Sequence, residues 1–124
     1  MFAPRIAAVA ALSIAFVAPA AAQPVTQTIQ VSSFAFSPHP IHLAAGAPVT
    51  LTFVNESGSG HDFTAKRFFA SSRIVAGSAP DGEIELRGHE TKSITLVPTA
   101  GTYKAHCSHF FHKQMGMTDE IIVQ

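Results

Sequence analysis

Short alternations of apolar and polar residues, broken every few positions by glycine or proline, are the feature that most limits how this chain can fold. Side chains of a β-strand point alternately to its two faces, so this pattern predicts half-buried strands rather than helices. The clearest case is residues 49–54, where Val49, Leu51 and Phe53 share one face. The alternating segments cover residues 28–31, 34–36, 41–43, 49–54, 61–64, 83–86, 93–97, 102–107 and 120–123.

Seven to eight strands in a single short domain predict an all-β fold, a Greek-key β-sandwich or barrel. Residues 66–76 are the exception, because they form the one segment that could be a short helix or an irregular connection. We assign Phe68 and Phe69 within this segment to the hydrophobic core rather than to a docking surface.

The N-terminal residues have a different composition from the rest. Arg5 precedes an apolar run over residues 6–18, and Ala20, Ala21 and Ala22 follow it. A positive charge, an apolar run and a small-residue cleavage site are the three parts of a secretory signal peptide. The run is shorter than the roughly 20 residues that a bilayer span needs. We therefore expect a signal peptide at residues 1–22, a mature domain at residues 23–124 and a periplasmic location without a membrane span.

The charge balance excludes one class of partner. Eight basic residues match eight acidic ones, so nothing indicates nucleic-acid binding. The mature chain has the length of one domain, which excludes a multidomain enzyme and suits a monomer.

The chain contains one cysteine, so it forms no internal disulfide. An unpaired thiol in an exported protein is either buried and inert or a metal ligand.

That cysteine, Cys107, lies in the segment richest in metal ligands. Residues 106–117 contain a thiol, three imidazoles and two thioethers. One cysteine and two histidines in a plane, with a weak axial methionine, form the ligand set of a blue-copper site. His61 follows a glycine-rich turn at the start of a predicted strand, which makes it the expected histidine from elsewhere in the chain.

Strand alternation separates the candidate ligands around Cys107. Ala105 and Cys107 share the face toward the core, so His106 points the other way. His109 is two residues from Cys107 in a tight turn and would reach the same metal only with strain. His112 lies five residues on and can close a loop over the metal.

The order of Cys107, His112 and Met117, spaced as C-x₄-H-x₄-M, with the upstream run Gly60-His61-Asp62-Phe63, resembles the cupredoxins, a family of small periplasmic blue-copper proteins. The resemblance covers the whole mature chain. It implies one type 1 copper ion with His61, Cys107 and His112 in the plane and Met117 as axial ligand. Met115, at H-x₂-M spacing, is the alternative axial ligand.

The resemblance also implies two supporting roles. The backbone amide of Asp62 would help to orient the thiolate, an interaction that tunes a metal site. Asn55 would tie the two ligand-bearing loops together.

The resulting functional expectation is the transfer of single electrons between redox proteins that dock near His112, without enzymatic activity. The alternative is a periplasmic copper-binding protein for copper tolerance, storage or delivery. It is supported by four surplus histidines that could form a second copper site: His39, His42, His106 and His109. A structural zinc site at the same cysteine and histidines is a further alternative.

Overall fold

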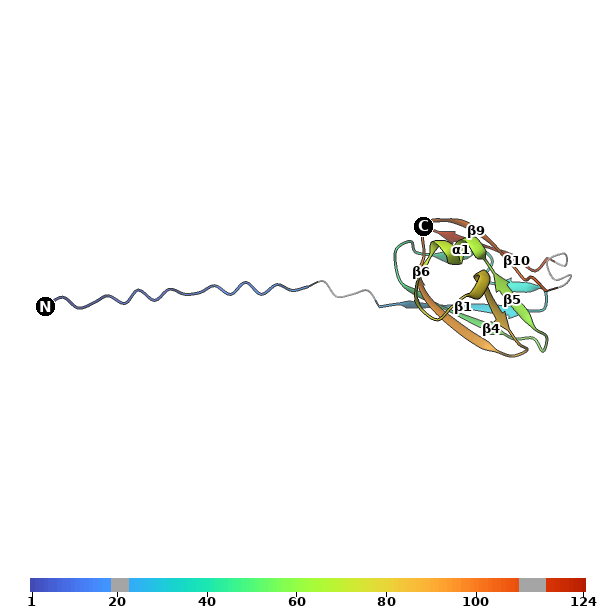
Figure 1. Ribbon diagram of the computed structural model, residues 1–124, viewed down its shortest axis with the longest axis horizontal. Coiled ribbons are helices and arrows are strands. Elements are labelled where there is room, and N and C mark those ends of the chain that lie inside the picture. The colour runs from blue at the N-terminus through green and yellow to red at the C-terminus, as the bar shows by residue number, and fades with distance from the viewer. Residues whose placement is uncertain (19–22, 110–115) are drawn as a thin grey trace.

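The computed structural model contains two five-stranded β-sheets packed face to face (Figure 1). The structure describes residues 1–18, 23–109 and 116–124. Sheet A has the strand order β2-β1-β4-β8-β6, and sheet B has the order β3-β10-β9-β5-β7. The strands are β1 Val25–Ser32, β2 Ala35–Ser37, β3 Ile41–Leu43, β4 Val49–Asn55, β5 His61–Thr64, β6 Arg73–Ala76, β7 Glu83–Leu86, β8 Thr91–Val97, β9 Gly101–His106 and β10 Thr118–Val123.

The chain changes sheet repeatedly, and this explains the mixed strand directions. β1 and β2 lie in sheet A, β3 in sheet B and β4 in sheet A again, so β1 and β4 pair in parallel. β3 and β10 are likewise parallel partners in sheet B. The predicted all-β sandwich is confirmed, with ten strands in the described residues instead of seven to eight.

The segment over residues 66–76 divides into two elements. The helix α1 covers only Lys66–Ser71, and β6 follows it at the edge of sheet A, paired with β8. Ile74 and Val75 within β6 are β-branched and therefore favour a strand once β8 offers hydrogen-bond partners. Phe68 and Phe69 are buried, as the sequence predicts.

Phe63 on β5 occupies the centre of the core between the two sheets. Its ring centroid lies 5.2 Å from that of Phe36 and 4.9 Å from that of Phe53, which are both in sheet A. The ring of Phe69 on α1 lies 6.4 Å away. This aromatic packing fixes β5 against sheet A, two residues from His61.

Residues 1–18 contain no helix or strand and extend away from the two sheets (Figure 1). Their large apolar side chains are exposed. Among the described residues, no helix has the length and apolar character required to span a membrane.

Replacing Phe63 by alanine should lower the free energy of unfolding by about 3–5 kcal/mol, because the change leaves a cavity among several aromatic rings. Urea denaturation of the metal-free protein measures this loss. Val75 is exposed on β6, so Val75→Ala is the matched control and should change stability by no more than about 0.5 kcal/mol. Equal losses in both variants would contradict the central position of Phe63.

Candidate metal centre

Two predicted ligands, His61 and Cys107, meet at one end of the space between the sheets. His61 begins β5 and Cys107 directly follows β9, which is the neighbour of β5 in sheet B. Their exposed fractions are 1% and 0%. Nδ1 of His61 lies 3.9 Å from Sγ of Cys107. A buried imidazole nitrogen and a buried sulfur at this separation can share one soft or borderline metal ion.

Met117 lies next to Cys107 because of a backbone hydrogen bond. The amide of Cys107 donates to the carbonyl oxygen of Met117 at 3.1 Å, which extends the antiparallel pairing of β9 and β10 by one step. The Met117 side chain is completely buried. His112 and Met115, the other two predicted ligands, lie outside the described residues.

The predicted alternation along β9 is confirmed. Tyr103, Ala105 and Cys107 are buried, while Lys104 is exposed and His106 is half-buried. His106 lines a separate cavity of about 750 Å³ on the outer surface of sheet B. The strand therefore turns the thiol of Cys107 inward and the imidazole of its neighbour outward.

Asp62 connects the histidine segment to the cysteine segment. Its backbone amide donates to Sγ of Cys107 at 3.5 Å, in agreement with the expected role. Its Oδ1 accepts hydrogen bonds from the Ser108 amide at 2.8 Å and from Thr64 Oγ1 at 2.7 Å. Its Oδ2 accepts a further bond from Ser108 Oγ. The sequence pattern did not predict this role of the carboxylate, although Asp62 and Ser108 each directly follow a predicted ligand.

Asn55 makes a different connection from the expected one. Its Nδ2 donates to the carbonyl oxygens of Ser59 at 2.8 Å and Arg87 at 2.9 Å. It thus joins the turn before His61 to the turn between β7 and β8, and Asp62 joins the ligand segments instead. The two turns are so close that a Cβ at Gly88 would collide with the carbonyl group of Gly58.

Burial raises the pKa of the Cys107 thiol above its ordinary value. The backbone amides of Asp62 and His109 oppose this shift, because hydrogen bonds to sulfur favour the thiolate. Burial has the larger effect, so the metal-free protein holds a neutral thiol at neutral pH. A bound metal must therefore displace this proton.

Two of the surplus histidines, His39 and His106, line the same outer cavity, and His42 and His109 lie elsewhere. The ring of His39 is exposed, and its Nδ1 lies 2.7 Å from Oδ1 of the buried Asp119. His42 is exposed on β3. His109 lies 2.8 Å from Glu85, measured from Nε2 to Oε1.

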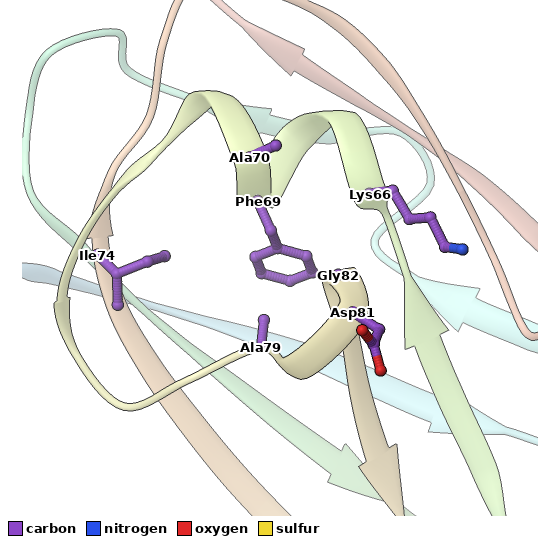
Figure 2. A pocket seen from close by; sticks show the side chains of 7 residues that line it. All are labelled: Lys66, Phe69, Ala70, Ile74, Ala79, Asp81 and Gly82. Atoms are coloured by element: carbon purple, nitrogen blue, oxygen red, sulfur yellow. The ribbon is translucent and has the colours of Figure 1, made fainter.

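A second surface pocket has no metal-binding character. It has a volume of about 440 Å³ and lies between α1, β6 and the 3-10 turn at Pro80–Gly82. Figure 2 shows the ring of Phe69 facing Ala79 inside it, with Lys66 and Asp81 to one side. None of its lining residues is a histidine or cysteine. The pocket is therefore no candidate for the chemistry of Cys107.

Comparisons with known proteins agree with this fold. A family model described as the cupredoxin-like domain matches residues 4–123. Auracyanin A, described as a "blue" copper protein from the green thermophilic photosynthetic bacterium Chloroflexus aurantiacus, is 22% identical, with a TM-score of 0.61 over 82% of this chain and 100% of that one. The auracyanin of Roseiflexus castenholzii, in its dithionite-reduced form, is 17% identical, with a TM-score of 0.61 over 83% of this chain and 98% of that one.

One structural neighbour is a longer protein. A multicopper oxidase from Campylobacter jejuni is 12% identical, with a TM-score of 0.62 over 87% of this chain and 32% of that one. At these identities the structural likeness establishes the fold alone. No curated protein matches the sequence.

The metal-free protein should lose stability as the pH rises above about 8.5, where a thiol in an unfolded chain ionises. The raised pKa of Cys107 in the folded state means that the unfolded chain releases this proton at a lower pH, so ionisation favours unfolding. Urea denaturation between about pH 7 and about pH 10 measures the effect. The Cys107→Ser variant should lack this part of the pH dependence. If the free energy of unfolding declines equally in both proteins, the thiol of Cys107 is not its cause.

Proposed function

This chain belongs to the family of cupredoxin-like domains, and we propose that it is a type 1 copper protein that carries single electrons between redox proteins. One observation carries the proposal. The Cys107 thiol and the His61 imidazole are both buried, their donor atoms are 3.9 Å apart, and the buried Met117 adjoins them. A thiol, an imidazole and a thioether form a donor set that suits copper better than zinc.

In the proposed site His61, Cys107 and His112 would hold the metal, and Met117 would add a weaker thioether ligand. Copper bound there would supply a one-electron Cu(II)/Cu(I) couple. The chain itself fixes the donors and keeps water from the sulfur. The Asp62 amide holds the thiolate, and the bond from Cys107 to the Met117 carbonyl fixes the spacing of the two sulfur-bearing residues. Donors held in this way move little when the charge of the metal changes.

The proposal includes a cleaved leader at residues 1–22 and a mature domain at residues 23–124 that acts in the periplasm. The leader is supported by burial: the large apolar side chains of residues 1–18 are exposed, and no residue of this segment belongs to the described core. The mature domain would act as a monomer and meet its redox partners near His112. It would perform no catalysis of its own.

Copper storage or delivery has less support than electron transfer. A store would gather its surplus ligands. His39 and His106 line the same outer cavity, but neither belongs to a converging group of three metal-ligating side chains in the described residues, and His42 is exposed on β3. In the described residues only one group of three metal-ligating side chains converges outside the proposed site. The copper content of the purified protein separates the two functions, because a carrier binds one tightly held ion and a store binds several.

Cys107→Ser should abolish the intense thiolate-to-copper absorption of the Cu(II)-loaded protein, because this band requires a sulfur–copper bond. His112→Ala should disturb the visible and EPR spectra strongly. His106→Ala is the matched control, since this imidazole is next to Cys107 but faces outward, and its spectra should stay nearly unchanged. If the serine variant keeps the band, the ligand assignment is wrong.

Met117→Gln should lower the reduction potential and change the EPR rhombicity, because an oxygen donor favours Cu(II) more than a thioether does. Copper should remain bound through the three stronger ligands. Met115→Gln is the comparison, and its shift should be much smaller by voltammetry. A larger shift at Met115 would assign the axial position to that residue and make Met117 a packing residue.

A further inference from the structure

Three metal-ligating side chains converge next to the proposed copper ligands, and two of them are on the opposite face of sheet B from His61. They are Asp62, Glu85 and His109, and one donor atom from each lies within 4.8 Å of the other two. Along β7, Ile84 and Leu86 face the core while Glu85 faces outward. Asp62 lies opposite Glu85, as His61 lies opposite Leu86. The two carboxylates are therefore on the other face of sheet B from His61, while the His109 ring lies beside the His61 ring, with the ring centroids 6.3 Å apart.

The strand register places two negative charges face to face. Asp62 and Glu85 are direct cross-strand partners in the β5–β7 ladder. Like charges in this position are destabilising, and a buried carboxylate needs a compensating positive charge. The Asp62 side chain is 1% exposed. Within the described chain, His109 is the residue whose side chain could supply a positive charge within 4 Å of either carboxylate.

Asp62 and His109 are held in place before any ion binds. Oδ1 of Asp62 is fixed by Thr64 and by the Ser108 amide. The His109 ring lies over Gly60, where an added Cβ would be 3.2 Å from Cε1. Nε2 of His109 is thereby directed at Oε1 of Glu85, at 2.8 Å, and lies 3.7 Å from Oδ2 of Asp62. Glu85 is 55% exposed and can adjust its side chain to an incoming ion.

We propose that Asp62, Glu85 and His109 bind one first-row divalent ion, such as Zn²⁺, at a site separate from the copper centre. Tetrahedral zinc with bonds of about 2.1 Å places its ligand atoms about 3.4 Å apart. The observed separations of 2.8 Å and 3.7 Å lie on either side of that value. The imidazole selects against Mg²⁺ and Ca²⁺, which prefer oxygen ligands. A bound ion would replace the direct contact between His109 Nε2 and Glu85 Oε1, with the neutral imidazole and the two carboxylates as its ligands.

An ion at this site would also act on the copper centre, a consequence that rests on the proposed function. Asp62 would contact both sites. Its backbone amide donates to Cys107 Sγ, and its carboxylate would be a ligand of the second ion. A nearby positive charge favours Cu(I) over Cu(II). The second site would therefore raise the reduction potential when it is filled.

The test uses Zn²⁺ and isothermal titration calorimetry on the full chain with Cys107→Ser, which removes the thiolate of the proposed copper site. We expect one Zn²⁺ per chain. Adding His109→Gln or Glu85→Gln should weaken binding by about 10-fold to 100-fold, a loss that even the removal of an outer-sphere partner can cause. Adding Glu83→Gln is the matched control and should leave the affinity unchanged, because Glu83 is on the same strand but opposite Thr64.

A further substitution, His61→Gln in the same serine background, locates the ion. If it abolishes Zn²⁺ binding while His109→Gln does not, the ion occupies the proposed copper site and the inference is wrong. The absence of Zn²⁺ binding by the folded serine variant also overturns it. Because these measurements need neither copper nor Cys107, their outcome is independent of the proposed electron-transfer function.

The copper-loaded protein with Cys107 intact supplies a second measurement. Zn²⁺ should raise its reduction potential by voltammetry, and His109→Gln should remove most of that rise. A potential that responds equally to Zn²⁺ in both proteins would contradict the assignment.

Discussion

The structure of this site depends on Asp62, which joins two parts of the chain that are far apart in sequence. Its amide bonds to the Cys107 sulfur, and its carboxylate accepts bonds from the backbone and side chain of Ser108. The carboxylate is buried, so each of these bonds is shielded from competition by water. Without this connection, β5 and the end of β9 would share only a short stretch of pairing, at Thr64 and His106.

The alternation of β5 gives the two faces of sheet B different chemistry. His61 and Phe63 face inward, one toward the thiol and the other into the aromatic core. Asp62 and Thr64 are hydrogen-bonded to each other on the opposite face, where Glu85 and His109 approach. Core packing, the proposed copper site and the proposed second ion site therefore all depend on four consecutive residues. A one-residue shift in register would exchange the two faces.

The local pattern of the sequence predicted much of this arrangement. Strand alternation placed Cys107 inward and His106 outward, and it placed Phe68 and Phe69 in the core because large apolar side chains have no favourable alternative. The pattern failed at residues 66–76, where the division into α1 and β6 depends on an exposed edge of β8. It also failed for Asn55, because its hydrogen bonds go to turns whose closeness has no local signature.

The sequence by itself determined the strand periodicity, the fold class and the candidate ligands Cys107, His112 and Met117, since these follow from residue type and from spacing within one segment. The family assignment rests on the match of the cupredoxin-like family model to residues 4–123. Only the tertiary structure decided that His61 and Cys107 lie 3.9 Å apart, that Asp62 joins their segments, and that Asp62 and Glu85 face each other beside His109. Those relations depend on which strands become neighbours. Neighbouring strands are selected by the packing of the whole core, because no single segment contains the contacts that distinguish one pairing from another.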